Sequence, residues 1–247
     1  MKKLLLSVVA IVGFGGIAAA ANMPAKSAAP VVTRPACGAA QFQGFYAGIS
    51  GGGVKHIASR TDNDEFLVDA ASYNLDKWGG IVGGTLGYNF ARCNTVWGVE
   101  IDGSWTSVNN DLTLHPNSVF FQTLGTKMQG FGTARGRGGV VVDDVFIYAT
   151  GGFAVARFKT LWQDFNNGFT PNDTFEQSQT RWGWTAGFGA EWAFARNWTF
   201  KSEVLYANFT DRTYTHNFPS FGNASFTDSD QIWVSRIGVN YRFGGGL

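Results

Sequence analysis

Hydrophobic and polar residues alternate with a period of two along several segments of this chain. In the segment 229–243, SDQIWVSRIGVNYRF, Trp233, Ile237 and Tyr241 share one face. Arg236 and Arg242 share the other face. Because successive side chains of a strand point to opposite sides, the pattern predicts a strand with one apolar and one charged face. Repeated along a chain, such strands fit a closed barrel that is apolar outside and polar within.

The pattern predicts about eight strands, the smallest common number for membrane barrels. They are 45–55, 78–90, 96–108, 127–142, 145–159, 181–194, 198–208 and 231–243. In 145–159 both phases carry apolar residues, and Arg157 and Lys159 conflict with the face of Phe153 and Val155. The orientation of this strand therefore stays open.

The predicted connections alternate between tight turns and long polar stretches. The tight turns are 91–95, 143–144 and 195–197. The long stretches are 56–77, 109–126, 160–180 and 209–230. Short turns on one side and long loops on the other are typical of outer-membrane barrels, with the short turns in the periplasm. We therefore expect an all-β protein, an eight-stranded antiparallel up-and-down transmembrane β-barrel over residues 44–243, with both ends of the barrel periplasmic.

Aromatic residues gather near the predicted strand ends, whereas the strand middles are small or aliphatic. Trp and Tyr favour the headgroup level of a bilayer because their rings are both apolar and polar. The candidate aromatic girdle consists of Trp78, Trp97, Trp105, Trp182, Trp198, Tyr241 and Phe243. The alternative is the aromatic core of a soluble sandwich. Only 15% of the residues are charged, against about a quarter in soluble domains, which favours the girdle.

The first 43 residues read as segments outside the barrel. Lys2 and Lys3, an apolar run and the small residues 19–21 predict a signal peptide over residues 1–21. A membrane-anchor helix is the alternative, and the short apolar run disfavours it. Residues 22–43 are rich in Ala and Pro and predict a flexible periplasmic lead-in. Residues 244–247 form a short tail.

Charged residues on the predicted inward faces are the main candidate site. They are Glu100, Asp102, Arg135, Arg137, Arg181, Glu191, Lys201, Glu203, Arg236 and Arg242. An eight-stranded barrel is only about as wide inside as side chains can fill, and unpaired buried charges are costly. We therefore favour a structural network of ion pairs over a selective pore.

The two cysteines, Cys37 and Cys93, form a second candidate pair. On the predicted topology both lie at the short-turn rim, beside neighbouring strands. Export to an oxidising compartment favours a disulfide between them. Two free thiols remain the alternative, because Cys37 belongs to the predicted flexible lead-in.

Several motifs carry a resemblance to a known family. They are GFYAG at 44–48, GGTLGYNF at 83–90, WGVEIDGS at 97–104, TARGRGG at 133–139, YATGGFA at 148–154, GWTAGFGAEWAF at 183–194 and GVNYRF at 238–243. With the Ala/Pro-rich lead-in, the chain resembles the small outer-membrane barrel proteins of alphaproteobacteria, the immunogenic or opacity-like porin family. Such barrels usually end on their terminal aromatic residue, which the assembly machinery reads, but here 244–247 follow Phe243.

The resemblance implies a non-catalytic outer-membrane protein with a structural and surface-exposed role. The alternatives are a narrow diffusion channel and a surface protein that binds haem or a host ligand through its loops. His56, His115 and His216 lie in or beside predicted long loops and share no motif, so we interpret them as solvated. We expect no cofactor and no metal site.

The sequence also argues against several activities and partners. It contains none of the hydrolase, metalloprotease or phosphate-loop motifs. The formal net charge is +1, and no basic face suggests nucleic acid. We expect contact with outer-membrane lipid and lipopolysaccharide. Lys55, Lys77, Lys127 and Lys159 lie near the predicted outer rim, as headgroup ligands or as solubilising charges.

Overall fold

A computed structural model describes residues 38–62, 72–114, 120–166, 171–218 and 222–243. The described part contains one short 3₁₀ helix, η1 (Gly38–Phe42), and nine strands. The strands are β1 (Gly44–Asp62), β2 (Ser72–Arg92), β3 (Thr95–Leu114), β4 (Phe120–Val142), β5 (Val145–Asn166), β6 (Pro171–Ala195), β7 (Trp198–Phe209), β8 (Arg212–Phe218) and β9 (Gly222–Phe243). No helix among these residues has the length and apolar character needed to cross a membrane.

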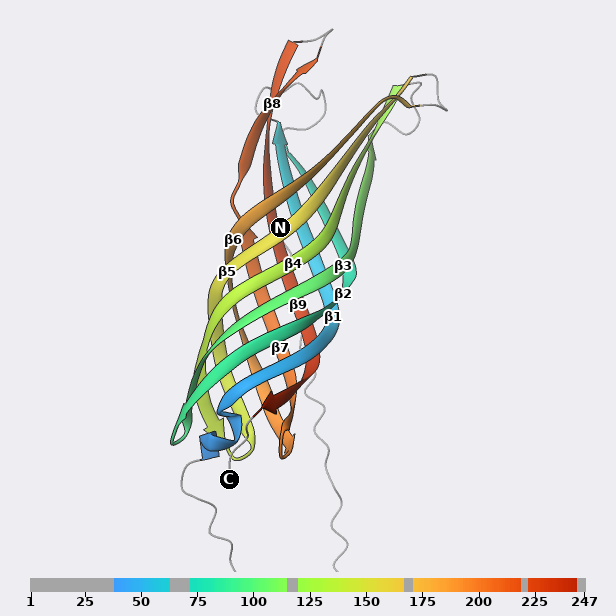
Figure 1. Cartoon of the computed structure of the whole chain (residues 1–247). Coiled ribbons are helices and arrows are strands. Elements are labelled where there is room, and N and C mark those ends of the chain that lie inside the picture. The colour runs from blue at the N-terminus through green and yellow to red at the C-terminus, as the bar shows by residue number, and fades with distance from the viewer. Residues whose placement is uncertain (1–37, 63–71, 115–119, 167–170, 219–221, 244–247) are drawn as a thin grey trace, which may run out of the picture. The chain divides into compact units, whose positions relative to one another are not determined.

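The strands form a closed antiparallel barrel, which confirms the predicted fold class. Each strand from β1 to β6 pairs with the next, β7 pairs with β9, and β9 also pairs with β1 (Figure 1). The pairing of β9 with β1 runs from Phe45↔Phe243 to Asp62↔Phe226, so the seam is closed along the whole of β1. The short strand β8 pairs with β9 alone and adds a hairpin arm beyond the eight-stranded wall.

The three tight turns lie together at one end of the barrel, as predicted (Figure 1). They fall at residues 93–94, 143–144 and 196–197. Cys93 and Asp143, the first residues of two of these turns, have φ values of 53° and 54°, a left-handed conformation that the favoured two-residue hairpin turns use.

At the other end the strands run further than predicted. β4 and β5, for example, stay paired as far as Phe120↔Asn166. Much of the four stretches expected to be loops is therefore hairpin arm, and β8 lies inside the stretch 209–230. The prediction failed there because apolar and polar residues occur in both phases of these segments, as in 120–126 (FFQTLGT) and 160–166 (TLWQDFN). The strict alternation that marks a half-buried strand is therefore absent.

Side chains alternate between the outer surface and the interior as the sequence predicted. On β3, Trp97 and Ile101 are exposed while Glu100 and Asp102 are buried. The undecided strand β5 is also resolved. Its residues Phe146, Tyr148, Ala154, Ala156 and Phe158 point inward, whereas Ile147, Phe153 and Arg157 are exposed.

The residues of the candidate girdle all lie on the outer face. Trp198, Tyr241 and Phe243 are in ring contact near the tight turns. Trp97 is near the same end. Trp78, Trp105 and Trp182 lie toward the long hairpins, at exposed fractions of 66–74%. Trp184 and Trp233 contact Tyr206 at that level, with ring centroids 5.4 and 5.0 Å apart. The apolar surface is thus bordered by aromatic rings at both ends.

The last residues of the predicted lead-in differ from the expectation of a flexible segment. Residues 38–42 form η1, whose Ala39 and Phe42 are buried against Val96, Phe146 and Tyr148. The Ala39 amide donates a hydrogen bond to the Cys93 carbonyl at 2.9 Å. η1 therefore caps the barrel at the short-turn end. The sequence of this segment has no periodic pattern, so it did not predict that Ala39 and Phe42 would be buried.

Cys93 lies in the turn between β2 and β3 and takes part in a disulfide. Cys37, the second cysteine of the chain, lies outside the described residues. The neighbouring Gly38 amide donates to Asn94 Oδ1 at 3.2 Å, so the chain next to Cys37 is held at this turn. The bridge between Cys37 and Cys93 remains a prediction.

Reduction of the exported protein is expected to slow its migration on a gel and to lower its stability. A closed loop of this length is worth about 4 kcal/mol in the chain-entropy model. The Cys37→Ser variant should migrate like the reduced wild type under both conditions. Identical migration of the wild type with and without reductant would show that the two cysteines are not bridged to each other.

Candidate functional site

The interior of the barrel is filled by three layers of side chains. An apolar layer lies at the short-turn end, with η1. Most of the buried charged residues form the middle layer. A second apolar layer lies toward the long hairpins and contains Val54, Ile81, Val108, Met128, Phe131, Ala154, Ala156, Phe158, Leu205, Ala207, Phe209, Ile232 and Val234. The expectation of a wholly polar interior therefore holds only for the middle of the barrel.

Glu100 on β3 is the centre of the charged layer. Its carboxylate pairs with Arg135 on β4, with Lys201 Nζ at 3.0 Å and with Arg137 Nη1 at 3.5 Å. Glu100 and Lys201 are each 1% exposed, measured on the side chain. Arg135 is the direct cross-strand partner of Glu100, whereas Lys201 reaches it from β7, across the interior. The pairing thus joins strands that are not neighbours in the sheet.

A second set of ion pairs surrounds Arg236 on β9. Its Nη1 lies 3.0 Å from Asp102 Oδ1, and its Nη2 lies 2.8 Å from Glu203 Oε1. Arg135 Nη1 contacts the other oxygen of Glu203 at 3.1 Å. Asp102 also accepts hydrogen bonds from Arg135 Nη2, at 3.1 Å, and from the Thr133 hydroxyl. Every carboxylate in this set contacts at least one guanidinium group.

Arg137 on β4 connects the charged layer to the short-turn end. Its Nη1 pairs with Glu191 Oε2 at 2.9 Å, and its Nε donates to Asn89 Oδ1 at 3.0 Å. Its guanidinium also lies 4.4 Å from the ring centroid of Tyr46. Glu191 accepts further hydrogen bonds from Thr199 and Asn240. The layer as a whole holds four cations and four carboxylates, namely Arg135, Arg137, Lys201, Arg236, Glu100, Asp102, Glu191 and Glu203.

Two tyrosines complete the layer and were missed in the sequence. The Tyr46 hydroxyl donates to Glu100 Oε2 at 2.8 Å, and the Tyr148 hydroxyl donates to Glu203 Oε2 at 3.0 Å. Both rings need glycine beside them. A Cβ at Gly87 would lie 2.2 Å from the Tyr46 hydroxyl, and one at Gly189 would lie 2.5 Å from that of Tyr148. An inward glycine on the strand next to an inward tyrosine is the signal that sequence reading could have used.

A separate polar cluster lies beside the second apolar layer, on the side of the long hairpins. His56 Nε2 lies 2.6 Å from Asp230 Oδ1, and Arg181 pairs with Asp230 and, at 3.3 Å, with Asp228. His56 is fully buried, at 0% exposure, and stacks on Phe158. The interpretation of His56 as a solvated loop residue was therefore wrong. Its partner lies 174 positions away in the sequence, so no local pattern shows the contact.

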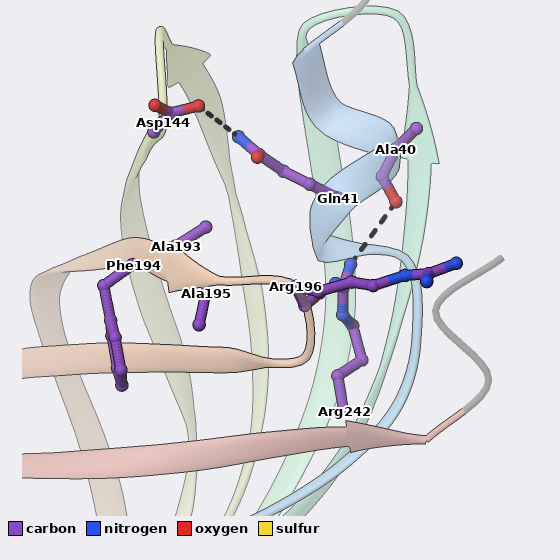
Figure 2. Close-up of a pocket in the computed structure, with 8 residues that line it drawn as sticks. All are labelled: Ala40, Gln41, Asp144, Ala193, Phe194, Ala195, Arg196 and Arg242. Atoms are coloured by element: carbon purple, nitrogen blue, oxygen red, sulfur yellow. Dashed lines mark hydrogen bonds between the residues drawn. The ribbon is translucent and has the colours of Figure 1, made fainter. Parts of the chain in front are cut away.

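Arg242 lies apart from the charged layer, at the short-turn end. It borders a recess of about 380 Å³ that is also lined by Gln41, Asp144 and Arg196 (Figure 2). Its guanidinium donates to the backbone carbonyls of Ala40, at 3.5 Å, and Arg196, at 2.5 Å. Arg242 therefore fastens η1 and the turn between β6 and β7 to the last strand.

Eight of the ten predicted interior charges thus meet in one layer, while Arg181 and Arg242 lie at its two ends. Sequence reading missed Tyr46, Tyr148, Asp230 and His56. His115 lies outside the described residues, and His216 belongs to β8. No group of three or more potential metal ligands occurs among the described residues.

The apolar outer band and the buried charges define a β-barrel membrane protein. A family model for the outer membrane protein β-barrel domain matches residues 8–243, and the chain belongs to this family. It is an outer-membrane protein.

The chain is similar to two curated outer-membrane proteins and to one solved outer-membrane structure. The 31 kDa outer-membrane immunogenic protein of Brucella melitensis is 33% identical over 252 residues, covering 98% of this chain and 100% of that protein. The 22 kDa outer membrane protein of Rhizobium leguminosarum is 27% identical over 185 residues, covering 72% and 76%. The outer membrane protein OprG of Pseudomonas aeruginosa has a TM-score of 0.47 at 13% identity, covering 81% of this chain and 98% of that one.

Replacement of Glu100 by Gln is expected to lower the free energy of unfolding by about 3–5 kcal/mol, because it leaves Arg135 and Lys201 without their shared carboxylate. The matched control is Asp76→Asn. Asp76 pairs with Lys55 at 3.0 Å on the exposed outer surface, and its loss should cost less than about 1 kcal/mol. Urea midpoints of the proteins refolded in lipid measure both effects. Equal shifts for the two variants would contradict a structural role for the charged layer.

Proposed function

We propose that this protein is a non-catalytic outer-membrane barrel that strengthens the envelope and presents its long hairpins to the outside of the cell. The observation that carries the proposal is the filled interior. A diffusion channel needs a continuous water-filled path, whereas here a charge-balanced layer lies between two apolar layers.

The charges of the middle layer are used within the protein. Lys201 and Glu203 are 1% and 2% exposed, and each lies within 3.2 Å of an oppositely charged group. A charge that is paired and desolvated in this way has little capacity left to attract a passing ion. This favours the structural role over the channel.

The buried His56–Asp230 pair bears on catalysis and on haem binding. A general base must reach the proton that it removes, and an axial ligand must reach the iron. His56 has no exposed surface and already contacts Asp230. Neither role suits it in this conformation, which supports a non-catalytic function.

The long hairpins support the surface role. β4 and β5 extend as a paired arm past the aromatic border, to Phe120↔Asn166, and β8 forms a second arm with β9. The 31 kDa relative of Brucella melitensis is described as an outer-membrane immunogenic protein. Hairpins that face outward from the cell would give such proteins an accessible surface.

Planar-bilayer recording tests the filled interior. The refolded full chain is expected to give no reproducible conductance steps, because the buried side chains of the three layers occupy the interior. An open sixteen-stranded porin, prepared in the same detergent, is the positive control. Reproducible unitary steps from this protein would establish the channel alternative instead.

Labelling on intact cells tests the orientation. Thr215 on β8 is exposed at the long-hairpin end, and Arg196 is exposed in the turn between β6 and β7. Thr215→Cys is expected to react with a membrane-impermeant maleimide on whole cells. Arg196→Cys should react only after the outer membrane has been opened. The reverse pattern would place the short turns outside and refute the proposed orientation.

A further inference from the structure

Two rows of paired residues cross strands β3 to β6 at the long-hairpin border of the apolar surface. The first row is Trp105, Gly130, Arg157 and Thr180. The second row is Asn109, Lys127, Lys159 and Ser178. Three cationic side chains therefore occupy neighbouring positions on β4 and β5.

These cations are on the membrane-facing side of the wall. On β5, the inward residue Phe158 is buried, while Arg157 is exposed like Phe153 on the same face. Phe153 is 74% exposed and Trp182, on the next strand, is 66% exposed. Along β5, Arg157 is the first charged outward residue after an apolar series that begins at Val145. Its height is thus that of lipid headgroups beside an aromatic border.

Arg157 and Lys127 carry the positive charge on which the patch depends. Lys127 lies directly opposite Lys159 in the sheet. Lys159 has a further interaction of its own, so the argument rests on Lys127 and Arg157. No ion pair joins either of these two to a described carboxylate, and their described row neighbours Asn109, Ser178 and Thr180 are neutral.

The outer surface of β1 and β2 offers the contrast. Lys55 lies at a similar border, beside its cross-strand partner Trp78, but its charge is neutralised by Asp76 at 3.0 Å. Lys55 therefore differs from Lys127 and Arg157, which form no ion pair with a described carboxylate.

We propose that Arg157 and Lys127, assisted by Lys159, bind the phosphate groups of a phosphorylated glycolipid in the surrounding leaflet. Arginine offers a planar pair of donors that matches two phosphate oxygens, and lysine adds a compact charge. The acyl chains of the lipid would then lie on Phe153 and Trp182. The inference rests on the proposed function, because it requires the long hairpins to be at the outer leaflet.

Titration of the detergent-refolded full chain with bisphosphorylated lipid A tests the site, with the midpoint of thermal unfolding as the readout. Arg157→Gln and Lys127→Gln should each weaken apparent affinity about fivefold, and the double variant about 30-fold. The matched control Lys55→Gln should stay within twofold of the wild type. Binding should also weaken as salt is raised, since exposed charges are screened.

Two further lipids discriminate between sources of the effect. Dephosphorylated lipid A should bind far more weakly than the bisphosphorylated form. Equal binding of the two, or a double variant within twofold of the wild type, would overturn the site. Binding of phosphatidylglycerol vesicles as strong as that of lipid A would overturn the choice of a glycolipid.

Heat-modifiable migration on a gel, measured on each variant, separates this inference from the proposed function. A variant that migrates as a folded barrel yet binds like the wild type counts against the patch alone. Conductance steps or reversed labelling in the earlier experiments count against the proposed function, whatever the lipid titration gives.

Discussion

The structure depends on one constraint, the absence of hydrogen-bonding partners in the hydrocarbon of a bilayer. Each backbone amide and carbonyl that crosses the membrane must be satisfied within the protein, so an open sheet edge there would cost several kcal/mol per group. The pairing of β1 with β9 from Phe45↔Phe243 onward removes that edge. Once the sheet is closed, the outward faces of β3 and β6 meet lipid, and exposed side chains such as Trp105 and Phe188 are stable there. In water the same surface would be an aggregation hazard.

Closure with so few strands also determines what the interior contains. The hollow is too narrow to hold bulk water and too large to be left empty, so inward side chains fill it. The apolar layers at both ends keep water away from the ion pairs between them. Ion pairs in such surroundings are costly to break, which ties Lys201 on β7 to Glu100 on β3 across the interior. Filling the barrel and excluding a channel are thus one structural property.

The outward alternation could be predicted well because lipid on one side and a packed interior on the other impose it on strands such as β3 and β6. The phase of β5 could not, since its inward face supplies both apolar layers, with Phe146 at one end and Phe158 at the other. Arg157 made the orientation of β5 still harder to predict, because it is a charged outward residue that lies beyond the apolar band. The contact of His56 with Asp230 depends on the closing seam, and the capping by η1 depends on the shape of the barrel end. Those features depend on three-dimensional packing, about which a local sequence pattern gives no information.

An apolar filling of equal volume would often be as stable as buried ion pairs, so stability alone does not account for the charged layer. Strand register offers a better account. In the observed register Glu203 lies opposite Arg236, and Glu191 lies opposite Lys201. A slip of two residues between β7 and β9 would place Arg236 opposite Lys201 or Leu205, and would leave a carboxylate buried without its partner. Between β3 and β4, where Glu100 lies opposite Arg135, a slip of two residues in one direction would still place Glu100 opposite Arg137 and Asp102 opposite Arg135. The charges therefore distinguish the observed register from a slipped one most strongly between β7 and β9. This pair is next to the seam where the barrel must close correctly.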